Sequence, residues 1–401
     1  MKHIYRLKNK IQEYEWGSRT DIAELMGKPA PSDKPQAELW MGAHSKAPSR
    51  VNLNGQWLSL ETAIDDNPAG ILGQTTAARF ANKLPYLFKV LAAAKPLSIQ
   101  AHPNLVQAKK GFKRENDDGI PLDAPRRNYK DNNHKPEILC ALKPFRALNG
   151  FRKIEEILLN MDHWCRLEMA AEIKNLEINS TSAGLQEFFE VLMTMDSDRK
   201  NRVIREVLHS AHRRPKEDPL RKAILSLYQE YPSDIGVLAP LYLNLVQLNP
   251  GEAMYLPAGQ LHAYIEGLGM ELMANSGNVL RGGLTPKHVD VPELLKTLTF
   301  EGQDVEKLSP EKVRTGELAY TTPAREFVLS IISVKADLPF LSATNRSVEI
   351  LLCTDGDLVI KNSGSGETLT LARGMSVMIA AALEKYSVEG EGILYKATVP
   401  I

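Results

Sequence analysis

Apolar residues follow two different spacings along this chain. Before about residue 150, and again after residue 232, they form short runs broken by Pro, Gly and Asn, as in LPYLFKVL at 84–91. Short runs bounded by turn-forming residues are typical of buried β-strands. Within the first region, only the segments 77–82 and 105–115 favour helices. Most of the chain is therefore predicted to form β-sheet.

Between residues 153 and 231 the apolar residues recur at i, i+3, i+4 and i+7, for example in LQEFFEVLMTM at 185–195. This spacing is that of amphipathic helices, which must bury one face against a neighbour. We predict a mainly β protein with a helical insert (α+β). We divide it into a first barrel from residues 1–152 and 233–300, a helical insert at 153–232, and a second barrel at 301–401.

The composition excludes several classes of protein. Lys and Arg number 49, as do Asp and Glu, and proteins that bind nucleic acid need a basic excess. The three cysteines (Cys140, Cys165 and Cys353) form neither a disulfide framework nor a CxxC pair, which favours a reducing compartment. The sequence has neither a secretory signal nor an apolar run of membrane-spanning length. We expect a cytoplasmic protein that binds neither nucleic acid nor membrane.

One group of motifs carries metal chemistry. The pattern G-x5-P-x-G-x2-H, from Gly251 to His262, resembles the second signature motif of the cupin barrels, in which the histidine binds a metal. In SIQAHPN, Gln100 and His102 are two residues apart, so a β-strand presents both on one face. NHKPE adds Glu137. Two imidazoles, a carboxylate and an amide oxygen form an N2O2 set that zinc accepts.

Seven motifs in order make the chain resemble the type I phosphomannose isomerases. They are YEWGS, AELWMGAH, LPYLFKVL, PLSIQAHPN, NHKPE, PAGQLHAY and ELMANSGNVLRGGLTPKHVD, and they cover roughly residues 1–300. The C-terminal region resembles the family in its β character only. The resemblance implies a zinc-dependent aldose–ketose isomerase with one zinc ion per chain. Such an enzyme interconverts mannose 6-phosphate and fructose 6-phosphate by moving a proton between C2 and C1 through an enediol(ate).

The resemblance also implies a set of site residues. The zinc ligands of the family fall on Gln100, His102, Glu137 and His262. Its active-site arginine falls on Arg281, and further pocket residues fall on Trp16, Glu38, Lys89, Ser98, Lys135, Glu271 and Lys287. Positioned proton transfer needs a base, and we leave Glu271 and Lys135 open as the proton carrier. Lysines of this set are candidates for proton transfer if burial lowers a pKa, or otherwise for phosphate contact.

Three departures from these patterns stand out. Gln100 replaces the first histidine of the usual cupin His-x-His, and Glu266 stands where cupins usually have Asn. Gly277 stands where the isomerase family commonly has Asp, so a carboxylate is missing there. The C-terminal strands keep no ligand set, and we expect the second barrel to be structural and metal-free.

Two alternatives to the isomerase remain. The same site can serve an isomerase that acts on another sugar phosphate, because the motifs specify the metal better than the sugar. A cupin that binds a sugar phosphate without catalysis is the alternative from another class. In each case the expected partner is a small sugar phosphate, and the expected oligomeric state is a monomer.

Overall fold

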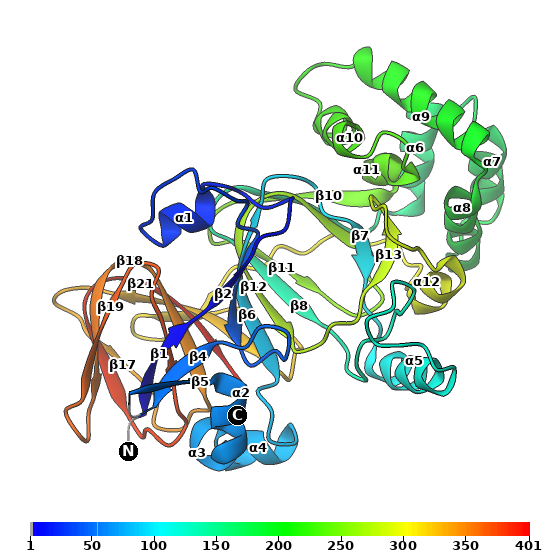
Figure 1. Ribbon diagram of the computed structural model, residues 1–401. Helices are drawn as coiled ribbons and strands as arrows, with labels where there is room; N and C mark the ends of the chain where they lie inside the picture. The colour runs from blue at the N-terminus through cyan, green and yellow to red at the C-terminus, as the bar shows by residue number, and fades with distance from the viewer. Residues whose placement is uncertain (1–2, 54) are drawn as a thin grey trace.

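Two large β-sheets and a group of helices make up the protein in a computed structural model that describes residues 3–53 and 55–401 (Figure 1). The long helices are concentrated at the end of the molecule far from the C-terminal strands, whereas short helices within residues 60–79 lie near the C-terminus, as the figure shows. Among the described residues, no helix is both long and apolar enough to cross a membrane. The predicted α+β fold with a helical insertion is confirmed.

The first sheet has ten strands and contains most of the predicted site residues. Its main path runs through β10 (Leu243–Leu248), β9 (Phe145–Phe151), β12 (His262–Ala274), β6 (Tyr86–Ala93), β3 (Glu38–Gly42) and β2 (Lys10–Gln12). Beside this path lie β7 (Ile99–Ala101), β8 (Glu137–Ala141), β11 (Ala253–Leu256) and β13 (Leu280–Gly283). The long strand β12 pairs with β6, β7, β8 and β9, so it brings distant motifs together.

The second sheet has eleven strands and joins the two ends of the chain. Its path runs through β14 (Glu311–Arg314), β15 (Glu317–Ala319), β16 (Val328–Val334), β21 (Tyr386–Thr398), β18 (Glu349–Asn362), β20 (Ser376–Ile379), β1 (Ile4–Lys8), β4 (Arg50–Leu53) and β5 (Gln56–Ser59). β17 (Phe340–Leu341) and β19 (Thr368–Ala372) pair with β21 and β18. Strand β1 lies antiparallel to β20, with Ile4 opposite Ile379. The first strand of the chain is therefore part of the C-terminal sheet.

The helical insertion lies between β9 and β10. It contains α6 (Ile154–Cys165), α7 (Ala170–Ile178), α8 (Ser182–Thr194), α9 (Ser197–His212), α10 (Pro219–Glu230), the 3-10 helix η1 (Ile235–Leu238) and α11 (Ala239–Tyr242). The side chains of Asp196 and Asp218 cap α9 and α10 by accepting backbone N–H groups. Apolar residues of these helices, such as Trp164 and Phe189, share one buried cluster with Ile99 and Ala263 from the first sheet.

The remaining helices are short, apart from α5. The predicted helix at 105–115 is present as α5 (Leu105–Asp117), whose capping box is formed by Asn104 and Gln107. The helix predicted at 77–82 is displaced, since α4 spans Gln74–Arg79. Ala81 and Asn82 have positive φ angles, which end the helical conformation. Four further short helices were not predicted: α1 (Asp21–Leu25), α2 (Leu60–Asp66), α3 (Pro68–Leu72) and α12 (Val291–Thr297).

Candidate active site

Three buried side chains of the first sheet form a possible metal site. One ligand atom from each of His102, Glu137 and His262 lies within 4.8 Å of the others, and each residue is 1% exposed. Nε2 of His102 is 3.4 Å from Oε1 of Glu137, and Nε2 of His262 is 3.4 Å from Oε2. Two neutral imidazoles and a carboxylate are ligands that zinc accepts.

Strand pairing explains why these side chains meet. His262 begins β12, Glu137 begins β8, and His102 directly follows β7. Gln100 on β7 lies opposite His262 on one side and opposite Arg281 of β13 on the other. The four ligands predicted from the sequence therefore come from three adjoining strands, with Arg281 on a fourth.

Unpartnered atoms at the centre of this group fit a bound cation. Glu137 Oε2 and His262 Nε2 are buried and have no hydrogen-bond partner within the described part of the chain. A buried polar atom without a partner costs about 1–3 kcal/mol, so two facing each other require an explanation. A metal ion between them would satisfy both atoms.

The other ring nitrogens hold the histidines in the orientation that a metal needs. His102 Nδ1 is 2.7 Å from the backbone oxygen of Asn278, and His262 Nδ1 is 3.0 Å from that of Gln260. A carbonyl can only accept, so each Nδ1 carries the proton and each neutral ring leaves Nε2 free as a ligand.

Lys135 controls the charge of this group. Its Nζ is 2.8 Å from Oε1 of Glu137 and 3.4 Å from Nε2 of His102. Burial raises the pKa of Glu137, but Lys135 and His102 outweigh it and hold this pKa well below its usual range. Burial and Lys135 lower the pKa of His102 to about 4. At neutral pH Glu137 is therefore a carboxylate and His102 is neutral, as metal ligands must be.

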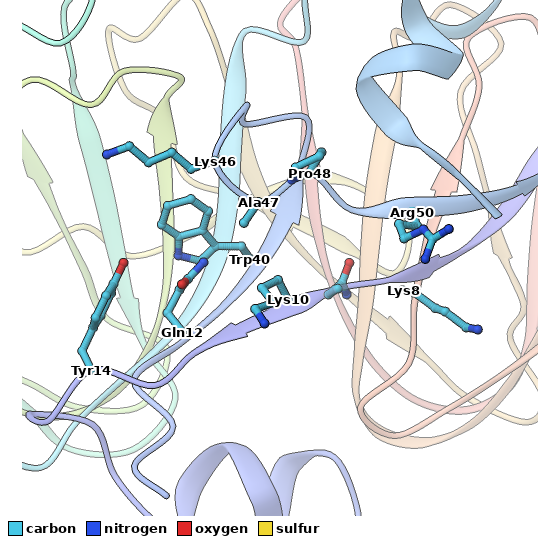
Figure 2. Close-up of a pocket in the computed structure, with 10 residues that line it drawn as sticks. Lys8, Lys10, Gln12, Tyr14, Trp40, Lys46, Ala47, Pro48 and Arg50 are labelled. Atoms are coloured by element: carbon cyan, nitrogen blue, oxygen red, sulfur yellow. The ribbon is translucent and has the colours of Figure 1, made fainter. Parts of the chain in front are cut away.

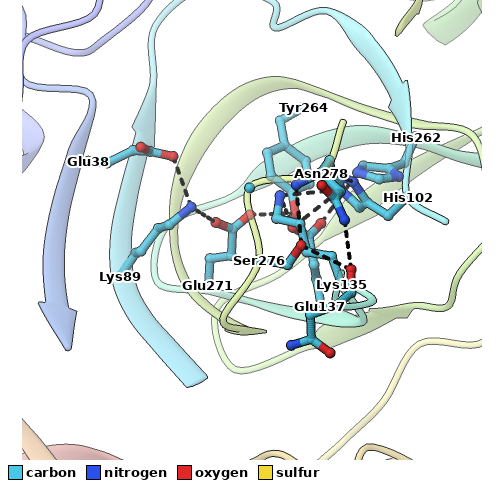
Figure 3. A network of polar contacts seen from close by, with 12 residues as sticks. Glu38, Lys89, His102, Lys135, Glu137, His262, Tyr264, Glu271, Ser276 and Asn278 are labelled. Atoms are coloured by element: carbon cyan, nitrogen blue, oxygen red, sulfur yellow. Dashed lines mark hydrogen bonds and ion pairs between the residues drawn. The ribbon is translucent and has the colours of Figure 1, made fainter. Parts of the chain in front are cut away.

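A second buried network surrounds Lys89 (Figure 3). Its Nζ lies 2.7 Å from Glu271 Oε2 and 3.3 Å from Glu38 Oε1, while the Tyr264 hydroxyl donates to Glu271 Oε1 at 2.9 Å. Burial by itself would lower the pKa of Lys89, but the two carboxylates raise it above its ordinary value. The lowered pKa that would let Lys89 transfer a proton is absent, so Lys89 remains charged.

Burial and Glu137 raise the pKa of Glu271, and Lys89 opposes this shift. Tyr264 was missed by the sequence analysis. It lies two residues after His262 on β12, and the alternation of a strand places both on one face.

The four cations among the predicted site residues fall into two kinds. Lys89 and Lys135 are buried and paired with carboxylates. Arg281, which is partly buried, and Lys287, which is exposed, form no ion pair within the described residues. Burial lowers the pKa of Arg281, and burial, Arg281 and Lys46 lower the pKa of Lys287. Lys46, two residues after the AELWMGAH motif, is a nearby cation that the sequence analysis missed.

Two predicted pocket residues, Trp16 and Ser98, are not part of the polar network that the described residues form around the metal group. Trp16 is partly buried and packs on a cluster that contains Leu91 and Leu139. Ser98 precedes β7 and is partly exposed. Within the described chain, no hydrogen bond connects either side chain to the metal group.

A pocket adjoins the Lys89 network. Figure 2 shows this pocket, which has a volume of about 340 Å³ and is lined by Lys8, Lys10, Lys46 and Arg50 among others. Trp40 also lines it and donates its indole Nε1 to Glu38 Oε2 at 2.8 Å. One side chain therefore separates the basic pocket from the carboxylate that holds Lys89.

Fold and site together define a class of protein. The chain is a sheet-rich protein with a helical insertion and a buried site for one metal ion, of the cupin type that the motif around His262 predicts.

Comparison with known families narrows this class. The sequence matches the family described as "Phosphomannose isomerase type I, catalytic domain" over residues 4–154 and the helical insertion domain of that family over residues 165–243. Residues 317–399 match "Mannose-6-phosphate isomerase, cupin domain". Mannose-6-phosphate isomerase of Escherichia coli (strain K12) is 42% identical over 393 residues, 98% of each chain. The chain therefore belongs to the type I phosphomannose isomerases.

A more distant relative and solved structures support the same family assignment. Mannose-6-phosphate isomerase of Bos taurus is 32% identical, and the alignment covers 100% of this chain and 96% of the relative. A crystal structure of a mannose 6-phosphate isomerase, described as holo and zinc-bound, matches with a TM-score of 0.92 and 38% identity over 100% of both chains. A variant of phosphomannose isomerase from Salmonella typhimurium matches with a TM-score of 0.93 over the same share.

Proposed function

We propose that this protein is a zinc-dependent aldose–ketose isomerase that interconverts mannose 6-phosphate and fructose 6-phosphate. The observation that carries the proposal is the pair of facing, unpartnered atoms Glu137 Oε2 and His262 Nε2. Support comes from full-length relatives that are mannose-6-phosphate isomerases and from a similar structure that holds zinc. We assign His102, Glu137, His262 and Gln100 as the residues that hold one zinc ion. When bound, zinc supplies a Lewis acid that lowers the cost of negative charge on a sugar oxygen.

Lys135 is the better candidate for the proton carrier between C2 and C1. Its Nζ is 2.8 Å from a carboxylate oxygen of the metal group, so it can reach a sugar held there. Both carboxylate oxygens of Glu271 already accept hydrogen bonds, one from Lys89 and one from Tyr264. Both lysines are paired with carboxylates, but the partner of Lys135 is a proposed zinc ligand, and a bound zinc ion would compete with Lys135 for it. We therefore assign proton transfer to Lys135, and to Glu271 the task of keeping Lys89 charged and in place.

Arg281 and Lys287 are the proposed anchors for the anionic substrate. Neither forms an ion pair within the described chain, whereas the charges of Lys89 and Lys135 are neutralised by carboxylates. Arginine can bind a phosphate or an enediolate in a bidentate manner, which lysine cannot do. Glu38, Trp16 and Ser98 are proposed to line the remaining sugar site.

Metal removal tests this function directly. Purified protein is given mannose 6-phosphate, fructose 6-phosphate is detected by a coupled enzyme, and the zinc content of the same preparation is measured. We expect activity that disappears after thorough chelation and returns when zinc is added. Full activity in protein shown to be free of metal would contradict the zinc assignment.

The same assay separates the isomerase from its alternatives. A non-catalytic sugar-phosphate binder would bind mannose 6-phosphate without forming product, at any zinc content. An isomerase for another sugar phosphate would have a much higher kcat/KM for a different aldose phosphate. Arg281→Ala should reduce kcat/KM strongly, and a near-normal value would remove Arg281 from the site.

A further inference from the structure

The carboxylate of Asp131 joins two loops that lead to the metal group. Residue 131 lies in the segment that precedes β8, and residues 275–279 connect β12 to β13. Asp131 Oδ1 accepts hydrogen bonds from the Ser276 hydroxyl at 2.8 Å and from the backbone N–H of Asn133 at 3.0 Å. Asp131 Oδ2 accepts one from the backbone N–H of Gly277 at 2.6 Å. This corner therefore has a carboxylate, although residue 277 itself is glycine.

Asn278 connects this corner to the metal site. Its side chain is fully buried, and its Oδ1 accepts the backbone N–H groups of Lys130 at 2.6 Å and Asp131 at 3.1 Å. Its Nδ2 donates to the backbone oxygens of Asn133 at 2.8 Å and Asp131 at 2.9 Å. Its own backbone oxygen is the partner of His102 Nδ1. Figure 3 shows Asn278 beside His102.

We propose that Asp131 is a positioning residue for the metal site, and this inference rests on the proposed zinc function. By holding residues 276 and 277, it fixes the carbonyl of Asn278 that orients His102. The carboxylate itself touches neither a ligand atom nor the centre of the metal group. Residues that orient metal-bound histidines typically change metal affinity by about 10–100-fold when they are replaced.

The chemistry of the corner requires a carboxylate and not an amide. A carboxylate offers two acceptor oxygens, and here both are used by donors from Ser276, Asn133, Gly277 and, at 3.3 Å, the Asn278 amide. An asparagine has one acceptor oxygen and an NH2 group that can only donate. In Asp131→Asn, the new NH2 group would therefore face an N–H or O–H donor of the neighbouring loop. That hydrogen bond would be lost, and residues 276–277 would be held less firmly.

Zinc affinity of the metal-free protein is the measurement that tests this inference. Zinc is titrated in competition with a chromogenic chelator into wild type, Asp131→Asn and the control Asp123→Asn. Asp123 lines the same cleft as Asp131, of about 1110 Å³, and loses the same charge without being part of this network. We expect about 10-fold weaker zinc binding for Asp131→Asn and no change for Asp123→Asn. At saturating zinc, the kcat of Asp131→Asn should return to near that of wild type with an unchanged KM.

The outcomes distinguish this inference from the proposed function. Equal zinc affinity in wild type and Asp131→Asn overturns the positioning role, whereas wild type that binds no zinc overturns the proposed function. A kcat that stays low at saturating zinc also contradicts a role through metal binding. If Asp131→Asn does not fold, Ser276→Ala is the second variant. It removes one hydrogen bond to Asp131 Oδ1, together with the contacts of the Ser276 hydroxyl with the Asn133 carbonyl and the Asn278 N–H at 3.2 Å each, and it should weaken zinc binding about threefold. An unchanged affinity in Ser276→Ala would then overturn the inference.

Discussion

Two buried lysines near the proposed metal site differ in the carboxylates that they contact. Lys89 lies between Glu38 and Glu271, neither of which belongs to the metal group. Lys135 contacts Glu137, which does belong to it. The first lysine is therefore suited to fixing the charge and shape of the pocket wall. The second is placed to exchange a proton with a substrate at the metal.

Replacing Lys135 tests this assignment. Lys135→Gln should lower kcat by about 100-fold or more, since positioned proton transfer contributes about 10²–10⁴-fold, while KM changes little. Steady-state kinetics with zinc content measured on the same sample give the result. Lys143→Gln is the control, because Lys143 is a half-exposed lysine that also pairs with carboxylates. A near-normal kcat in Lys135→Gln, together with an inactive Glu271→Gln, would transfer the role to Glu271.

His44 makes stability depend on pH. Its Nδ1 accepts the backbone N–H of Lys46 at 3.2 Å, which only a neutral ring can do. Burial, followed by Lys89, Lys46 and Lys135, lowers its pKa to about 4. The unfolded chain, with an ordinary histidine pKa of about 6.5, takes up a proton before the folded one does. The contribution of His44 is therefore present above about pH 6.5 and is lost as the pH falls toward 4.

His44→Gln isolates this contribution from that of other groups. Between about pH 7 and about pH 4.5, wild type should lose about 2 kcal/mol more unfolding free energy than His44→Gln, after allowance for solvent screening. Urea unfolding at several pH values measures the difference. Parallel pH profiles of the two proteins would show that the folded state accommodates the charged ring.

At the scale of elements, α5 and α12 are joined both directly and through Tyr129. Arg114 of α5 forms an ion pair with Glu293 of α12 at 2.9 Å. The ring of Tyr129 packs against Gly111 of α5, and its hydroxyl donates to Glu293 of α12 at 2.7 Å. Its backbone N–H donates to Glu115 of α5 at 2.9 Å. The segment that precedes β8 is thus held against both helices.

Replacing Gly111 of α5 by Ala should destabilise the protein, although such a change usually stabilises a helix. Helix propensity alone makes Ala more stable than Gly by about 1 kcal/mol. A Cβ on Gly111 would lie 2.3 Å from the Tyr129 ring, and overpacking costs about 1–3 kcal/mol. Gly111→Ala should therefore lower the thermal stability, whereas Lys110→Ala at the exposed neighbour should change it little. A higher melting temperature for Gly111→Ala would show that Tyr129 moves without cost.

At the scale of the whole molecule, the two sheets share one hydrophobic core. A single buried cluster contains Val90 and Met270 from the first sheet and Phe327, Ile350 and Leu352 from the C-terminal region. Strand β1 also crosses to the second sheet before the chain enters the first. The two sheets are therefore expected to unfold together and not as independent units.

Phe327→Ala tests this shared core. The side chain is fully buried, and loss of a buried phenylalanine costs about 3–5 kcal/mol. Hydrogen exchange of peptides from β12 and β18 is measured at increasing denaturant concentration. In Phe327→Ala, both regions should lose protection at the same denaturant midpoint, which is lower than that of wild type. Loss of protection in β18 alone would mean that the second sheet unfolds separately.

Elements and candidate site residues that depend on local spacing could be predicted from the sequence. The i, i+3, i+4 pattern predicts the helical insertion, because a helix buries one face. The separation of Gln100 from His102 predicts a shared strand face, and short motifs place Glu137 and His262 in the metal group. Where the domains begin and end, and which roles the site residues have, remain predictions.

Features that depend on partners distant in sequence could be recognised only in the folded protein. Lys89 and Glu271 are separated by 182 residues, so their ion pair, and with it the raised pKa of Lys89, has no local signal. The carboxylate beside Gly277 comes from Asp131, and the partner of β1 comes from the last strands of the chain. Local patterns specify which side chains face inward, but long-range strand pairing specifies which charges are neutralised and which remain free for a substrate.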